Sequence, residues 1–111
     1  MSADVLGARP QWRRTGSTFF PYAAFVDGRW WVLRLNCFPD HPCWTLFIDD
    51  GRRFDFDDEP AGWGIRTADE APLLEGHVAA EVLAPVQGLA RYGSEVGAPC
   101  DDFLCPCAWR E

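Results

Sequence analysis

Lysine is absent from this chain of 111 residues, and all ten of its basic side chains are arginines. Seventeen acidic residues outnumber them, giving a formal net charge of -7. A nucleic-acid-binding protein needs a positive surface to neutralise phosphates. The shortage of positive charge therefore argues against direct binding of nucleic acid. The use of arginine alone indicates a GC-rich genome, and it also suits planar, bidentate ion pairs.

Long hydrophobic runs are absent as well. A membrane-spanning helix needs about 20 consecutive apolar residues, and no stretch of this sequence approaches that length. Residues 1–14 lack the basic region followed by an apolar run that marks a secretory leader. We therefore expect a cytoplasmic protein that does not insert into a membrane.

Catalytic signatures are missing too. The sequence contains no phosphate-binding loop, dinucleotide fingerprint, metalloprotease helix motif or serine nucleophile elbow. Each of these would have indicated a class of enzyme. We therefore expect a protein that is not an enzyme.

The composition is that of a folded chain, because 48% of the residues are apolar and 14% are aromatic. The length suits one small domain over residues 1–111. Residues 1–18 are polar and rich in turns, so we expect a partly flexible N-terminus that docks through Trp12. Residues 94–111 form a cysteine-containing tail without regular periodicity.

Four β-strands are predicted between residues 19 and 56. Asp27-Gly28 and Asp50-Gly51 each separate two apolar runs, a strong signal for a hairpin turn. Pro39 and Pro42 make residues 38–42 a rigid connecting loop. The predicted strands are Phe19–Val26, Arg29–Asn36, Cys43–Asp49 and Arg52–Phe56. Strands that follow each other this closely form an antiparallel four-stranded meander.

The second of these strands has two apolar faces. Trp31, Leu33 and Leu35 alternate with Trp30, Val32 and Arg34. Because side chains of a strand alternate between faces, we expect this strand to be central and covered on both sides.

A helix is predicted over residues 68–91. Thr67 and Glu70 have the spacing of a capping box, and apolar residues recur at helical intervals from Leu74 to Leu89. Pro85 should kink or split this helix. The predicted fold class is therefore α+β, an antiparallel sheet with a kinked or split helix packed on one face.

Cysteine and histidine residues form the sharpest chemical pattern. Two cysteines frame a histidine in one loop and three lie in the tail: Cys37, His41, Cys43, Cys100, Cys105 and Cys107. Zinc prefers four thiolate or imidazole ligands, which two such clusters could supply together. The gaps of five, four and one residues differ from the two-residue gap of many zinc sites. The alternatives are small apolar side chains or a tail disulfide formed on oxidation.

His41 also admits other interpretations. It could raise the thiolate fraction of Cys37 or Cys43 in a nucleophilic pair, but the sequence indicates neither an oxyanion hole nor an orienting third residue. An exposed loop histidine is the alternative. His77 is expected to be structural or to face solvent.

Carboxylates concentrate around the second predicted hairpin: Asp49, Asp50, Asp55, Asp57, Asp58 and Glu59. Such a cluster could bind divalent cations or transfer protons, although the calcium-loop pattern is absent and Arg52 and Arg53 lie within it. It could equally be a solvated edge that discourages strand addition, or a face for a basic protein partner. Trp63, between two glycines, would either close the core or anchor that partner.

Several segments resemble the immunity proteins encoded beside bacterial polymorphic toxins. They are FVDGRWWVLRLN, FPDHP, WTLFIDDG, the Trp63-Gly64 turn and YGSEVGAPCDDFLC. The resemblance implies a protein that binds its cognate toxin domain and blocks the active site or the path of the substrate. It assigns no role to an individual residue. A toxin that handles nucleic acid would offer a basic cleft suited to this negative charge.

Two hypotheses from different classes follow. The first is a non-enzymatic, toxin-neutralising immunity protein that docks through the six carboxylates and Trp63 on a basic toxin domain. The second is a small zinc-binding structural domain that uses the clustered cysteines and His41. An aromatic patch left uncovered on the sheet would favour a homodimer.

Overall fold

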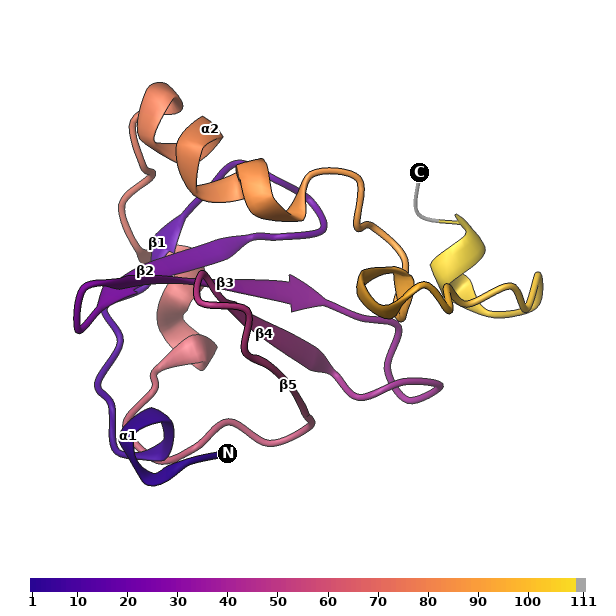
Figure 1. Cartoon of the computed structure of the whole chain (residues 1–111), viewed down its shortest axis with the longest axis horizontal. Coiled ribbons are helices and arrows are strands. Elements are labelled where there is room, and N and C mark those ends of the chain that lie inside the picture. The colour runs from indigo at the N-terminus through magenta and orange to yellow at the C-terminus, as the bar shows by residue number, and fades with distance from the viewer. Residues whose placement is uncertain (110–111) are drawn as a thin grey trace.

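The computed structural model describes residues 1–109 and has an α+β fold, a five-stranded antiparallel sheet accompanied by short helices (Figure 1). The strands are β1 (Arg13–Arg14), β2 (Tyr22–Val26), β3 (Arg29–Leu35), β4 (Trp44–Ile48) and β5 (Arg53–Phe56). The α-helices are α1 (Ala3–Leu6) and α2 (Gly76–Leu83). The 3₁₀-helices are η1 (Ile65–Glu70), η2 (Ala84–Val86), η3 (Ser94–Val96) and η4 (Pro106–Trp109).

The strands follow the order β1-β2-β3-β4-β5, which is a simple meander. The prediction of four strands was wrong by one, because β1 pairs with the start of β2 through Arg13 and Arg14. Two consecutive arginines carry no alternating apolar pattern, and this short strand is held by backbone pairing. Strand β2 also begins later than expected, since Phe19 and Phe20 lie in a bend before Pro21.

Both predicted hairpin turns are present. Asp27 and Gly28 have positive φ angles of 50° and 78°, as a two-residue type I′ turn requires. In the second turn only Gly51 is left-handed, with φ 96°. The Gly51 amide donates to the Ile48 carbonyl at 2.9 Å, and the Ile48 amide donates to the Arg52 carbonyl at 2.9 Å.

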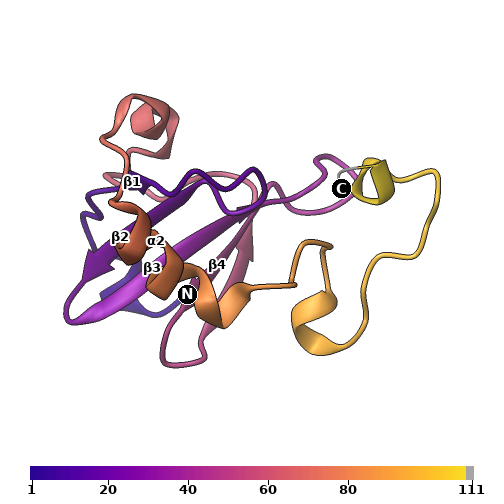
Figure 2. The same cartoon turned by 90° about the horizontal axis from the view of Figure 1, so that it is seen from above.

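Strand β3 is central and covered on both faces, as its two apolar faces predicted. Trp31 and Leu33 belong to a core cluster that includes Val5, Trp12 and Trp63. On the opposite face Val32 packs in a second cluster with Phe20, Ala23, Val82 and Val86. Figures 1 and 2 show α2 above the sheet, with the N-terminal segment and η1 on the other side.

The predicted helix over residues 68–91 is much shorter in the structure. Residues 65–70 form η1, and the Thr67 hydroxyl donates to the Gly64 carbonyl at 3.3 Å. Ala71 is extended before Pro72, because a residue that precedes proline avoids the helical region. Helix α2 then gives way at Ala84 to η2, which contains Pro85, so the expected break is confirmed.

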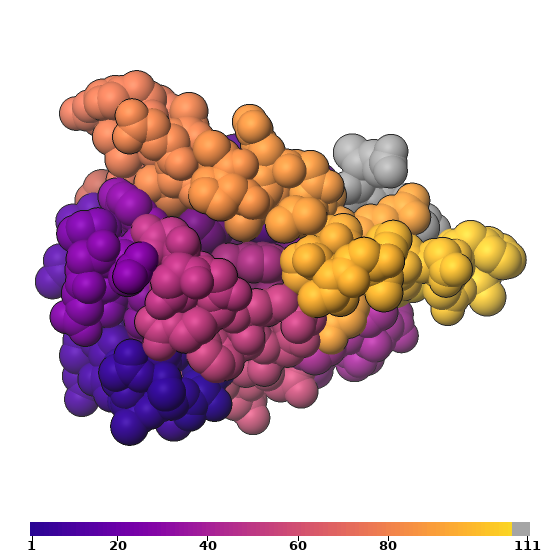
Figure 3. Space-filling model, viewed as in Figure 1, coloured from indigo at the N-terminus to yellow at the C-terminus, as the bar shows by residue number. Residues whose placement is uncertain are grey.

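The C-terminal tail lies at one end of the sheet beside the loop between β3 and β4, and it forms a protrusion in the space-filling view (Figures 1 and 3).

Among residues 1–109, no helix has the length and apolar character needed to cross a bilayer.

Candidate metal centre

One imidazole and three thiols converge at the end of the sheet where the tail lies. The possible ligand atoms of His41, Cys100, Cys105 and Cys107 all lie within 4.8 Å of one another. His41 comes from the β3–β4 loop, and the three cysteines come from the last part of the chain. Folding therefore brings together the two thiol-bearing segments that the sequence singled out.

The β3–β4 loop presents His41 through a tight turn and a ring stack. The His41 amide donates to the Cys37 carbonyl at 2.8 Å, which closes the loop. The His41 ring stacks on Tyr92, with centroids 4.4 Å apart and planes inclined by 14°. This stack fixes the plane of the imidazole, whose Nε2 lies 3.4 Å from Cys105 Sγ.

The tail is held against the sheet by hydrogen bonds around the thiols. The Cys100 amide donates to the Tyr92 carbonyl at 2.9 Å, and Arg91 Nη1 donates to the Cys100 carbonyl at 3.3 Å. Cys105 and Cys107 are buried and pack together with Cys37. The centre is therefore a partly buried cluster of soft donors.

A buried arginine connects the tail to β3. The Arg34 side chain is fully buried, and its Nη1 donates to Glu95 Oε1 at 2.7 Å and to the Arg91 carbonyl at 3.0 Å. Its guanidinium carbon lies 5.2 Å from the centre of the Phe47 ring and 5.6 Å from that of Tyr92. Because Tyr92 also stacks on His41, Arg34 positions the same segment that supports the cluster.

Two thiols of the cluster are weak acids in this environment. At Cys105 a backbone hydrogen bond from Cys107 favours the thiolate, but burial and hydrogen bonds with the Cys100 and Cys107 thiols outweigh it and raise the pKa to about 11. Burial and a hydrogen bond with Cys37 raise the pKa of Cys107. A bound cation would have to displace the protons of both groups.

The donor set fits zinc. Zinc–sulfur bonds of about 2.3 Å at tetrahedral angles place the sulfurs about 3.8 Å apart, and a nitrogen ligand slightly closer. The His41–Cys105 separation of 3.4 Å already has this size, and the 4.8 Å limit on the remaining pairs requires closure by only about 1 Å. Three thiols and one imidazole form a combination that structural zinc sites use.

Two of the six predicted metal ligands lie outside the set of four. Cys37 is buried beside Cys105 and Cys107, but it is not one of the four residues whose donor atoms converge. Cys43 is half-buried at the start of β4, where its amide donates to Asp57 Oδ1 at 2.9 Å. Burial, reinforced by the negative charge of Asp57, raises the pKa of Cys43.

Most of the carboxylates predicted to bind a partner make hydrogen bonds within the chain. Asp49 accepts from the Trp30 amide at 3.0 Å, and Asp55 accepts from Thr45 at 2.7 Å. Asp50 pairs with Arg52, Asp57 binds the Cys43 amide, and Glu59 accepts from the amides of Ile65 and Arg66. Asp58 is exposed. These carboxylates therefore stabilise turns and strand ends.

Trp63 requires a correction, because it is not an exposed anchor for a partner. Its side chain is only 1% accessible, and its ring centre lies 5.4 Å from Trp31 and 6.1 Å from Trp12. The Trp12 indole Nε1 donates to the Trp63 carbonyl at 2.7 Å. Trp63 therefore closes the core, which was the alternative interpretation of its position.

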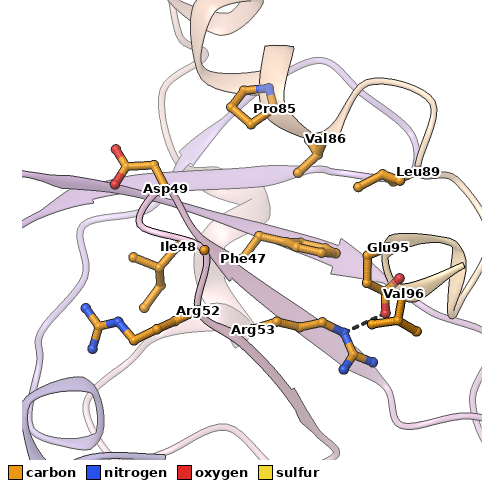
Figure 4. Close-up of a pocket in the computed structure, with 11 residues that line it drawn as sticks. Phe47, Ile48, Asp49, Arg52, Arg53, Pro85, Val86, Leu89, Glu95 and Val96 are labelled. Carbon is orange, nitrogen blue, oxygen red and sulfur yellow. Dashed lines mark ion pairs between the residues drawn. The ribbon is translucent and has the colours of Figure 1, made fainter.

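A groove of about 420 Å³ lies between the β4–β5 hairpin and η2 (Figure 4). Its floor is apolar, with Phe47, Val86 and Leu89 among the lining residues. The charged groups on its walls bind neighbours in the chain: Arg53 Nε lies 2.5 Å from Glu95 Oε2, and Arg52 pairs with Asp50. The metal centre is the more specific site, because its donors converge on one point.

Sequence reasoning missed the two residues that support the centre from the side. Arg34 was assigned to a strand face without a partner, and Tyr92 appeared only as the first residue of the segment YGSEVGAPCDDFLC. A charged residue inside the apolar run from Trp30 to Leu35 of β3 is a signal that could have drawn attention to Arg34. Tyr92 carries no comparable local signal.

Comparison of the chain with protein-family models, with curated proteins and with solved structures gave no match.

Proposed function

We propose that this protein is a small zinc-binding domain in which one zinc ion joins the β3–β4 loop to the C-terminal tail. The observation that carries this proposal is the convergence of His41, Cys100, Cys105 and Cys107 from two distant parts of the chain. Zinc would be held by three thiolates and by Nε2 of the imidazole. Its role is structural, because all four positions of a tetrahedral site are then filled by the protein.

The tail needs such a link more than the sheet does. Residues 94–109 contain only two short 3₁₀-helices, and the buried apolar side chains of this end are mainly thiols. Structural metal ions contribute directly to folding where a segment has little core of its own. The Tyr92 stack and the Arg34 network place the ligands, and the metal would fix them.

Metal analysis of the purified protein tests the proposal. We expect one zinc ion per chain, and we expect cobalt to give the absorption of a tetrahedral thiolate site when it replaces zinc. Cys105→Ser should abolish stoichiometric binding, because it removes a thiol that lies 3.4 Å from His41 Nε2. The tail of the chelated protein should become more sensitive to proteolysis than its sheet.

Cys43→Ser is the matched control, since it changes the same chemistry outside the set of four. It should retain zinc with unchanged affinity. A protein that binds no metal would refute the proposal. Equal loss of zinc in Cys43→Ser and Cys105→Ser would refute the assignment of the ligands.

The second candidate function is a non-enzymatic binding protein, with a toxin-neutralising immunity protein as its specific form. The exposed large apolar side chains support it, because Phe38, Phe103 and Leu104 are 60–76% accessible near the centre. Together with the net charge of -7 they fit a basic protein partner. Coexpression with the product of the adjacent gene tests this function, and the absence of a complex with that correctly folded protein would refute the immunity role.

A further inference from the structure

Two of the proposed zinc ligands, Cys100 and Cys105, flank a short loop that we call the tip, residues 101–104. Asp102 shapes this loop: its Oδ1 accepts from the Leu104 amide at 3.0 Å, and its carbonyl accepts from the Cys105 amide at 2.9 Å. Phe103 is 76% accessible and Leu104 is 69% accessible. The tip therefore displays two large apolar side chains between two anchored ends.

Other exposed apolar side chains belong to the same end of the molecule. Phe38 in the β3–β4 loop is 60% accessible, and Val96 in η3 is 62% accessible. Figures 1 and 3 show the tail projecting beyond the sheet at this end. Exposed apolar surface rimmed by polar groups marks interaction sites, and aromatic side chains dominate the binding energy of many interfaces.

The exposed charges of the tip and of the neighbouring β3–β4 loop are negative. Asp40, Asp101 and Asp102 are exposed, whereas Arg91 is half-buried and its Nη1 donates to the Cys100 carbonyl at 3.3 Å. A surface of this kind repels acidic partners and attracts basic ones. The preferred occupant is thus a protein with an apolar pocket surrounded by arginine or lysine.

We infer that the tip is the docking site for such a basic protein, which receives Phe103 and Leu104 in its pocket. The inference rests on the proposed zinc centre, because ligands at both ends would hold the loop in its binding conformation. Preorganisation of this kind reduces the entropy lost on association. The carboxylates beside the tip would orient the partner and accelerate the encounter.

The test uses zinc-loaded protein immobilised beside the double variant Phe103→Ser/Leu104→Ser. The probe is the fraction of source-cell proteins that a cation exchanger retains. Any protein that the immobilised wild type captures is purified, and its affinity for the wild type and for the double variant is measured. Binding to the double variant should be about tenfold or more weaker. Leu73→Ser, which changes a side chain that is 57% accessible outside the tip, should bind like wild type. Added salt should weaken the complex.

Zinc content measured on the same preparations separates this inference from the proposed function. Zinc-loaded protein that captures no basic protein through the tip overturns the docking site and leaves the zinc centre standing. Protein without zinc overturns the proposed function. Equal capture by loaded and chelated protein overturns the bracing role of the metal, and equal loss in Leu73→Ser overturns the assignment to the tip.

Discussion

The sheet and the metal end of this molecule are stabilised in different ways. The sheet lies between two apolar clusters, one built around Trp12, Trp31 and Trp63 and the other around helix α2. The metal end, which we define as residues 36–43 and 89–109, relies on the Arg34 network, the Tyr92 stack and the thiols. Apolar contacts spread over many side chains can thus stabilise a sheet, whereas a segment without them depends on a few hydrogen bonds, one ring stack and the thiols.

The buried areas explain this difference. A buried tryptophan removes about 150–250 Å² from water, worth about 4–6 kcal/mol at about 25 cal/mol per Å² as an upper bound. A thiol buries a small fraction of that area. Ordering each backbone residue costs about 1–2 kcal/mol. A zinc ion at the proposed centre would therefore give the irregular tail what the sheet gains from its aromatic side chains.

The largest effect is expected from Trp63→Ala, which breaks the sheet side of the comparison. Removing a large buried aromatic side chain leaves a cavity and should lower the free energy of unfolding by about 3–5 kcal/mol. Urea unfolding followed by circular dichroism would measure this change. Zinc affinity of the folded protein should stay as in wild type, because Trp63 packs in the core cluster around Trp12 and Trp31.

Trp30→Ala is the control for that change. Trp30 is only partly buried and lies beside the exposed Phe25 at a ring-centre distance of 5.2 Å. Its replacement by alanine should lower the free energy of unfolding clearly less than Trp63→Ala does. Equal losses for the two variants would mean that burial does not distinguish the two tryptophans.

Arg34→Met should lower the free energy of unfolding by about 3 kcal/mol, and it should affect both the sheet and the metal end. It removes a fully buried cation and leaves Glu95, whose side chain is 5% accessible, with Arg53 as its remaining ionic partner. Both urea unfolding and zinc affinity should respond, because Arg34 also holds the Arg91–Tyr92 segment. Arg52→Met, at a more exposed ion pair, should lower the free energy of unfolding clearly less. Unchanged zinc affinity in Arg34→Met would separate the network from the centre.

Local patterns explain why the sheet was largely predictable. The Asp-Gly turns and the alternation along β3 depend on neighbours in sequence, and both predicted hairpin positions are confirmed. Strand β1 escaped prediction because the backbone pairing of Arg13 and Arg14 leaves no side-chain pattern. The helix prediction was too long because helical spacing continued through residues that Pro72 and Pro85 keep out of an α-helix.

The metal end was predictable in composition but not in geometry. The sequence indicated that Cys37, His41, Cys43 and the tail thiols form a site only if folding joins the two segments. Which donors converge depends on the path of the tail past β3. That path is set by Arg34 and Tyr92, whose partners lie far away in sequence.

The smallest expected effect is a loss of stability in acid that results from protonation of Glu95. Burial would raise its pKa, but the hydrogen bond and charge of Arg34, together with the charge of Arg53, outweigh burial and lower the pKa below 4.5. The unfolded chain thus binds this proton more readily than the folded protein does. The stabilisation is complete above the unfolded pKa and is lost as the pH falls through the folded one.

The difference in unfolding free energy between wild type and Glu95→Gln isolates this contribution, because both proteins keep the same cysteines and His41. The difference should be constant near neutral pH and should shrink as the pH falls below about 4.5. The Glu95 carboxylate faces Arg34 of β3 and Arg53 of β5, and Asp55 also pairs with Arg53, at 2.8 Å. Both strands therefore contribute to the balance of charge around Glu95. A difference that grows in acid would mean that burial raises the pKa of Glu95 more than the two arginines lower it. The buried ion pair would then destabilise the junction between the sheet and the metal end.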